Sequence, residues 1–94
     1  MNSVYILFSE QLNRYYVGES CDVKDRIEKH NSGYYKNSFT SASNDWKLFF
    51  QIICESRVQA RKVESHIKKM KSRKYIQDLK LYPEMVSKLK EKFK

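Results

Sequence analysis

Two short apolar runs open the chain and are separated by a polar segment. Val4–Phe8 combines β-branched and aromatic residues, Ser9–Arg14 is polar, and Tyr15–Val17 is apolar again. Apolar runs of this length and composition are typical of β-strands, and a short polar segment between two of them indicates a turn. Gly18 ends the second run. The pattern therefore predicts a β-hairpin at the start of the chain.

A helical period follows the hairpin. Asp22 is suited to cap a helix that starts near Val23. The Asn31-Ser32-Gly33 run is suited to end it, because Gly33 readily adopts the left-handed conformation of a helix C-cap. One side of this predicted helix carries Val23, Ile27 and then His30 or Asn31.

Residues 34–45 carry no hydrophobic period. They are rich in Ser, Thr, Asn and Lys, a composition that predicts a surface loop able to reach a ligand. The apolar segment from Trp46 to Cys54 follows and has the composition of a strand. The sequence therefore predicts a third strand, separated from the hairpin by one helix and one loop.

The best-marked helix lies after the third strand. Ser56 and Gln59 form the S-x-x-Q pattern of a capping box at its start. Its apolar stripe at helical spacing is formed by Ala60, Val63, Ile67 and Met70. The stripe predicts a helix that ends near Lys71. A short helix around Arg73–Leu81 and a last helix opened by Pro83 complete the pattern.

The predicted order of elements is ββαβααα, which places the chain in the α+β class. Elements in this order favour a small three-stranded antiparallel sheet flanked by helices that cover its apolar face. With 94 residues, the chain is close to the usual size of one domain. We expect the main domain to span residues 1–82 and the helix in residues 83–94 to belong to the same single domain.

The charge of the chain narrows the class of partner. Lys and Arg total 19 against 11 Asp and Glu, which gives a formal net charge of +8. This charge attracts anions such as phosphate backbones and anionic membranes. No apolar run approaches 18 residues and no basic region precedes an apolar stretch at the N-terminus, so neither a membrane nor a targeting segment is expected. The composition therefore favours nucleic acid over a membrane as the partner.

The two cysteines carry little functional information. Cys21 and Cys54 lie far apart and belong to no C-x-x-C pair. They therefore predict neither a zinc site nor a disulfide framework. A reducing compartment, and hence a cytoplasmic location, fits this use of cysteine.

Several residues stand in an order that resembles the GIY-YIG nuclease family, in its small single-domain form. Val4-Tyr5 on the first strand and Tyr16-Val17-Gly18 on the second occupy the places of the two motifs that give the family its name. Further residues that agree with the family pattern are Arg26, the His30-Asn31-Ser32-Gly33 run, Trp46-Lys47-Leu48 and Glu64. The resemblance covers Val4 to about Tyr75, which is most of the chain.

This resemblance implies a metal-dependent endonuclease that hydrolyses phosphodiester bonds in nucleic acid, with DNA favoured. In such an enzyme Tyr5 acts as general base toward the attacking water, Arg26 stabilises the phosphate, and Glu64 holds Mg²⁺ or Mn²⁺. Tyr16 and His30 would orient the water or hydrogen-bond the phosphate. Which of these two shares the role of the base stays open.

The residue types also suit this chemistry on physical grounds. Arg26 and His30 are spaced i, i+4 on one helix face, so a guanidinium and an imidazole can approach one phosphate together. Glu64 offers an oxygen ligand to a hard cation, which commonly binds through one or two carboxylates, substrate oxygens and water. A phenol with an ordinary pKa of about 10 is a poor base at neutral pH, so Tyr5 needs nearby positive charge.

A run of positive charge follows Glu64 within seven residues. Its members are Lys68, Lys69, Lys71, Arg73 and Lys74. The run predicts a nucleic-acid-binding surface that contacts phosphates without reading base sequence. The same run also fits a solvated helix surface without a ligand.

A few positions depart from the family pattern. Ser3 stands where the first motif has Gly, and Glu19 and Ser20 follow the second motif where some relatives carry a basic residue. No Asn lies shortly after Glu64, where Gln77 is the nearest polar amide. Two alternatives therefore stay open: a non-catalytic nucleic-acid-binding domain with the same fold, and a protein-interaction module whose basic face binds an acidic partner.

Overall fold

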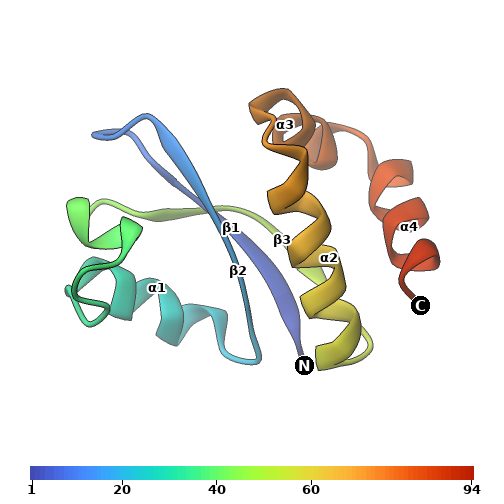
Figure 1. Ribbon diagram of the computed structural model, residues 1–94, viewed down its shortest axis with the longest axis horizontal. Helices are drawn as coiled ribbons and strands as arrows, with labels where there is room; N and C mark the ends of the chain where they lie inside the picture. The colour runs from blue at the N-terminus through green and yellow to red at the C-terminus, as the bar shows by residue number, and fades with distance from the viewer.

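The computed structural model describes all residues from 1 to 94. In chain order its elements are β1 (Ser3–Ser9), β2 (Arg14–Ser20), α1 (Val23–Asn31), the 3₁₀ helix η1 (Phe39–Ala42), β3 (Lys47–Ile53), α2 (Arg57–Met70), α3 (Arg73–Leu81) and α4 (Pro83–Lys92) (Figure 1). The predicted order ββαβααα is confirmed, and η1 is added within the predicted loop. No helix has both the length and the apolar character needed to span a bilayer.

The strands form one antiparallel sheet in the order β2-β1-β3, so β1 is central and β2 and β3 are edges. The hairpin register sets Tyr5 opposite Gly18 and Leu7 opposite Tyr16. The pairing of β1 with β3 shifts between Ile6 and Leu7. Because directly opposed residues point to the same face of a sheet, the register places both tyrosines on one side.

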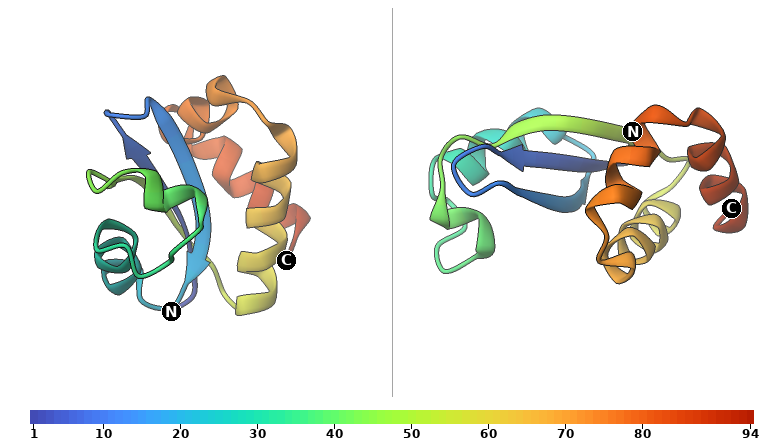
Figure 2. Two further views of the ribbon diagram at one scale, coloured as in Figure 1. Left: turned by 60° about the vertical axis from the view of Figure 1, so that its left-hand side comes forward. Right: turned by 90° about the horizontal axis from the view of Figure 1, so that it is seen from above.

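Helices cover both faces of the sheet (Figure 2). α2 packs against β1 and β2 from one side, with α3 and α4 beyond it, whereas α1 and η1 lie on the other side. The expectation that helices cover a single apolar face is therefore corrected. The physical reason lies in β1, which is buried along both faces because residues 3–7 are each at most 3% exposed.

The larger core lies on the α2 side of the sheet and is mainly aliphatic. It combines strand residues with the inner faces of α2, α3 and α4: Val4, Ile6, Val17, Ile52, Cys54, Ala60, Val63, Ile67, Ile76, Leu79 and Leu89. Leu89 of α4 belongs to this core, so the C-terminal helix packs against the same core as the strands. The predicted stripe of α2 holds except at Met70, the last residue of the helix, which is 44% exposed.

Side-chain caps fix where α1 and α2 begin. The Asp22 carboxylate accepts a hydrogen bond from the Asp25 amide, as predicted for α1. The Ser56 hydroxyl accepts one from the Gln59 amide at 3.1 Å. The Gln59 side chain reaches back to the amide of Glu55 rather than to that of Ser56, at 2.7 Å, and donates to the carbonyl of Lys90 in α4. Gln59 therefore also ties α2 to α4.

The segment between α1 and β3 is anchored rather than free. Gly33 takes the left-handed conformation expected after α1, with φ of 78°. The Asn31 side chain donates to the carbonyl of Trp46 and accepts from its amide, at 2.9 and 2.8 Å. The Trp46 indole donates to the carbonyl of Thr40 in η1 at 2.9 Å. These bonds hold η1 against α1 and the start of β3.

Candidate active site

The two strand tyrosines lie side by side on the α1 face of the sheet. Tyr5 is 1% exposed and Tyr16 is half-buried. Their ring centroids are 6.3 Å apart. The smaller core on this face contains Tyr5, Leu7 and Trp46, with Tyr16 packed against it. This face therefore carries aromatic residues where the opposite face carries aliphatic ones.

Gly18 makes room for the ring of Tyr5. A Cβ atom at position 18 would lie 2.6 Å from both Cζ and Oη of Tyr5, which is closer than side-chain atoms can approach. The Tyr5 ring therefore crosses over β2 at Gly18, and its hydroxyl lies above this edge strand. The glycine of the second motif is needed here because of the close approach of another side chain.

His30 of α1 completes a buried chain of hydrogen bonds. Its Nε2 lies 3.0 Å from the hydroxyl of Tyr5, and its Nδ1 lies 2.7 Å from Oγ1 of Thr40. Burial, and next the charge of Arg26, lowers the pKa of His30 to about 4. The imidazole is therefore neutral at pH 7, with one nitrogen as donor and the other as acceptor. If Tyr5 donates to Nε2, Nδ1 carries the proton and donates to Thr40.

Both tyrosines remain phenols at neutral pH. Burial raises the pKa of Tyr5 well above its usual range, and the neighbouring Tyr16 adds to this, while Arg26 opposes it only in part. Burial likewise raises the pKa of Tyr16, which the charge of Lys68 partly offsets. A free Tyr5 phenolate is therefore not the resting state of this site.

Arg26 and Glu64 approach the tyrosines from opposite sides of the sheet. Arg26 lies on α1 with its guanidinium 6.0 Å from the ring centroid of Tyr35. Glu64 lies on α2. The negative charge of its carboxylate raises the pKa values of Tyr5 and Tyr16, so this charge acts on both phenols. Because β2 is an edge strand and α2 packs along it, the two faces meet at this edge.

Glu64 is paired with a lysine of the basic run. Its carboxylate lies 2.9 Å from the ammonium of Lys68, which in turn lies 5.8 Å from the ring centroid of Tyr16. The structure thus brings all five predicted site residues to one region: Tyr5, Tyr16 and His30 in direct contact, and Arg26 and Glu64 at its two flanks. Lys68 joins this group at the cleft side.

The donor set suits a hard divalent cation such as Mg²⁺ or Mn²⁺ better than it suits zinc. No three His, Cys, Asp or Glu side chains are grouped to enclose an ion. A structural or catalytic zinc site would need three or four such ligands. Mg²⁺ needs fewer, because it keeps several waters and binds through one or two carboxylates and substrate phosphates. Glu64 fits that requirement, and a cation there would compete with Lys68 for its carboxylate.

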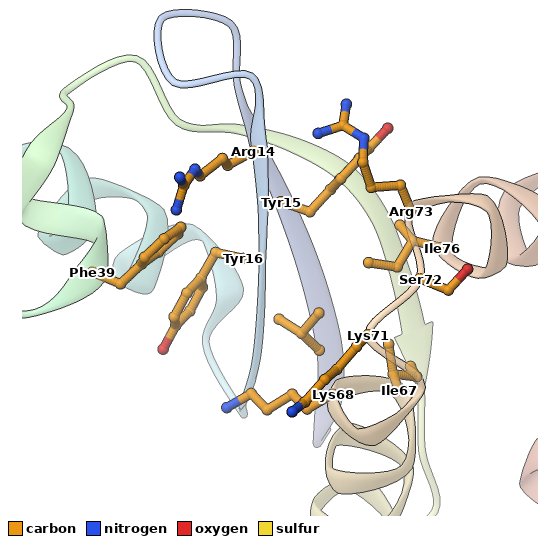
Figure 3. Close-up of a pocket in the computed structure, with 11 residues that line it drawn as sticks. Arg14, Tyr15, Tyr16, Phe39, Ile67, Lys68, Lys71, Ser72, Arg73 and Ile76 are labelled. Atoms are coloured by element: carbon orange, nitrogen blue, oxygen red, sulfur yellow. The ribbon is translucent and has the colours of Figure 1, made fainter.

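A cleft of about 820 Å³ adjoins these residues on the outer side of β2 (Figure 3). Tyr16 is the one member of the five that lines it. Its aromatic and basic lining residues are Tyr15, Tyr16, Phe39, Arg14, Lys68, Lys71 and Arg73. Lys71 ends α2 in the left-handed conformation, with φ of 48°, and faces this cleft.

The predicted basic run does not form a single surface. Lys68, Lys71 and Arg73 line the cleft, although Arg73 also donates to the carbonyl and side chain of Asn13 at 2.6 and 3.0 Å. Lys69 lies in a separate hollow on the outer side of α2, with Arg61 and Lys62 among its neighbours. Lys74 forms an ion pair with Asp78 at 2.8 Å.

The residues that depart from the family pattern make side-chain contacts of their own. Ser3 is buried and accepts from Gln51 at 3.0 Å. The side chain of Glu19 is 15% exposed and lies 3.7 Å from Arg57 at the start of α2. Gln77 donates to the hydroxyl of Tyr15 at 3.3 Å. The contacts of Glu19 and Gln77 lie away from Tyr5 and Tyr16, because Glu19 and Tyr15 face the α2 side of the sheet.

Three further residues at the site were not predicted from sequence. Thr40 orients His30, and Arg14 and Phe39 line the cleft. Their signal in the sequence is weak, because Thr40 and Phe39 lie in an aperiodic polar segment and Arg14 lies at the end of a turn. An aromatic residue within so polar a segment is the one feature that could have marked Phe39.

Comparison with known proteins agrees with this geometry. The sequence pattern of the GIY-YIG catalytic domain matches residues 1–76. A protein described as UPF0213 protein, from Syntrophus aciditrophicus (strain SB), is 32% identical over 83 residues, which cover 88% of this chain and 94% of the relative. No solved structure gives a significant match. The motif residues on β1 and β2 and the match over most of the chain show that this protein belongs to the GIY-YIG family.

Proposed function

We propose that the protein is a metal-dependent endonuclease that hydrolyses phosphodiester bonds in nucleic acid, with DNA as the favoured substrate. The observation that carries this proposal is the buried contact of Tyr5 with His30, flanked by Arg26 and Glu64. A phenol held against a neutral imidazole can move a proton, and the flanking charges suit a phosphate and a cation. Family membership supports a nuclease of this kind.

The proton path follows the hydrogen bonds of the site. A water attacking phosphorus loses a proton to the oxygen of Tyr5, and Tyr5 passes its own proton to Nε2 of His30. The imidazole becomes an imidazolium whose Nδ1 proton is held by Thr40. This transfer avoids a free phenolate, which the raised pKa of Tyr5 makes costly. The negative charge of a bound phosphate favours the charged imidazole, because it offsets the effect of Arg26.

The flanking residues bind and orient the substrate. Arg26 would pair with a phosphate oxygen beside Tyr5. Lys68, which lies over the ring of Tyr16 and lines the cleft, would contact the substrate where the site meets the cleft. Glu64 would hold a divalent cation, which stabilises charge on the phosphate and on the departing oxygen when bound. Lys68 would then exchange its carboxylate partner for a phosphate of the substrate strand.

A non-catalytic nucleic-acid-binding domain is the second candidate. The specific observation in its favour is the closed ion pair between Glu64 and Lys68, which occupies the carboxylate that a cation needs. In that case the cleft would still bind phosphates, and no strand would be cut. The two candidates predict the same binding surface and differ in turnover.

The test is an incubation of the pure protein with duplex, branched and single-stranded DNA and with RNA. Each substrate is incubated with Mg²⁺, with Mn²⁺ and with a chelator, and products are followed by gel electrophoresis. We expect cleavage of at least one substrate with metal and none with chelator. Binding to every substrate without cleavage of any would favour the non-catalytic domain. Neither binding nor cleavage would favour an acidic protein as the partner.

A further inference from the structure

Phe39 is an exposed aromatic residue that the proposed chemistry does not use. It lies at the start of η1, is 44% exposed, and lines the cleft (Figure 3). Most large aromatic side chains bury their faces, because their apolar area contributes strongly to folding. A ring that is left open to a basic cleft beside a candidate active site therefore needs a reason.

The ring is held in place by its neighbours. Thr40, the next residue, is 1% exposed and is bonded to His30 and to the Trp46 indole. The Phe39 ring is inclined by only 18° to that of Tyr16, with centroids 6.5 Å apart, and its centroid lies 6.0 Å from that of Trp46. Because η1 is anchored at its second residue, the exposed ring of Phe39 has little freedom to turn away.

Positive charges surround the open ring. The guanidinium of Arg14 lies 5.7 Å from the centroid of Phe39. Lys68, Lys71 and Arg73 lie on the opposite wall of the same cleft, as Figure 3 shows. An aromatic face between cations is the combination with which proteins bind unpaired nucleic acid, since the bases stack on the ring while the cations bind the phosphates.

We propose that Phe39 is the stacking platform for an unpaired nucleobase of the strand that enters the cleft. This inference rests on the proposed function for the identity of the ligand, but it does not require cleavage. It makes Phe39 a specificity-determining residue, because a base in a continuous duplex has both faces covered by its neighbours and cannot stack on a protein ring. The substrate strand is therefore unpaired at the cleft, either within a single strand or through a base extruded from a duplex.

A plain apolar role for Phe39 makes a different prediction. If the ring only covers Tyr16 and Trp46, a leucine of similar size would serve equally well. The informative variants are therefore Phe39→Leu, which keeps an apolar side chain, and Phe39→Trp, which keeps an aromatic face. Tyr34→Leu is the matched control, because Tyr34 is 63% exposed with Lys29 at 4.8 Å from its ring and does not line the cleft.

The experiment measures binding of oligonucleotides that carry the fluorescent base analogue 2-aminopurine, in chelator so that nothing is cut. Stacking quenches this fluorescence. We expect Phe39→Leu to weaken binding of the single strand by roughly tenfold to a hundredfold and to abolish the quenching. Phe39→Trp and Tyr34→Leu should bind like the wild type. Circular dichroism confirms that each variant is folded. Equal binding by wild type and Phe39→Leu on every substrate would overturn the inference.

Two further substrates identify the source of the base. A duplex with 2-aminopurine opposite a mismatch tests an extruded base. Its neighbours quench it in the free duplex, so fluorescence of bound Phe39→Leu above that of both the free duplex and the wild-type complex supports that source. An oligonucleotide of abasic residues keeps the phosphates and has no bases, so Phe39→Leu should not change its affinity. An equal loss on the abasic strand would mean that the ring acts on the backbone or on the fold, which contradicts stacking. A wild type that binds through Phe39 but never cleaves would disprove the endonuclease and leave this inference standing.

Discussion

The two faces of the sheet are built from alternate residues of the same strand, yet they differ in chemistry. Val4 and Ile6 of β1 point into the aliphatic core under α2, whereas Tyr5 and Leu7 point toward α1 and Trp46. Nearly all buried polar residues lie on or beside the α1 face: Ser3, Ser9, Ser20, His30, Thr40 and Ser43. Gln59 is the exception, at the start of α2.

This difference indicates a division of tasks between the faces. Aliphatic burial contributes stability in proportion to area and offers no groups for chemistry. The α1 face contributes less aliphatic burial but holds a connected set of hydrogen bonds, which must be fully satisfied to be tolerated. No buried side-chain polar atom in this structure lacks a partner. The division can be tested by substitutions that affect one face and leave the other unchanged.

The largest expected effect follows from Glu64→Ala. Cleavage should become undetectable, because loss of the carboxylate removes the anchor of the cation, a loss of several kcal/mol in the transition state. Binding should persist or tighten in chelator, since a negative charge beside the phosphate site is removed. Cleavage rate and dissociation constant are measured on one substrate, with Glu28→Ala on the exposed side of α1 as control. A folded Glu64→Ala protein that cleaves at the wild-type rate would refute the proposed mechanism.

Tyr5→Phe should separate chemistry from stability on the α1 face. Removing the hydroxyl deletes the proton path to His30, and general acid–base catalysis typically contributes about 10²- to 10⁴-fold in rate. The free energy of unfolding should fall by about 1 to 3 kcal/mol, because Nε2 of His30 is left buried without a partner. Single-turnover cleavage and urea denaturation measure the two quantities. Tyr34→Phe, on an exposed ring, should change neither; a fall in stability without a fall in rate would assign Tyr5 to packing.

Much of this site could be predicted because it depends on local spacing. The resemblance to the GIY-YIG family marks Tyr5 and Tyr16, which the hairpin register then places on one face. The i, i+4 spacing places Arg26 and His30 together. Thr40 and Phe39 could not be found, because their positions depend on bonds from η1 to α1 and to Trp46, and no hydrophobic period in the sequence marks these contacts. The sequence also did not reveal that helices cover both faces of the sheet. This arrangement depends on the strand order, which makes β1 central and which composition does not indicate.

The basic run after Glu64 is continuous in sequence, but the fold directs its residues to different surfaces. Successive residues of a helix are turned by about 100°, so neighbours such as Lys68 and Lys69 cannot share one face. We therefore expect Arg14→Gln with Lys71→Gln to reduce the slope of log affinity against log salt by about 0.7 to 0.9 for each lost contact. The matched pair Lys69→Gln with Lys74→Gln removes the same charge outside the cleft. Equal slopes in the two double variants would mean that the cleft is not the phosphate-binding surface.

A smaller effect is expected on the aliphatic face. Ile52 is 2% exposed in the core under α2, and Ile52→Val should lower the free energy of unfolding by about 0.5 to 1.5 kcal/mol. The cleavage rate per folded molecule should not change, because the residue faces away from the tyrosines. Urea denaturation and single-turnover kinetics test this. A rate loss larger than the loss of folded protein would show that the two faces are coupled.

The dependence of stability on pH tests the buried imidazole of the α1 face. The pKa of His30 falls from an ordinary value near 6.5 in the unfolded chain to about 4 in the folded protein. Between these values the unfolded chain binds more protons, so acidification from about pH 6.5 to pH 4 lowers the free energy of unfolding. The variant His30→Gln should lose less stability over this range than the wild type. Identical losses in urea titrations at pH 7, 5.5 and 4.5 would show that His30 is not buried in its neutral form.

The position of Gly18 has a genetic consequence. Since the ring of Tyr5 occupies the space that a side chain at position 18 would need, residues 5 and 18 share one volume across the hairpin. A harmful substitution at 18 should therefore be suppressed within the same gene by a smaller residue at 5, and such revertants would regain a folded protein without regaining cleavage. In an evolving lineage, a lasting change at Gly18 would mark the passage from an enzyme to a binding domain.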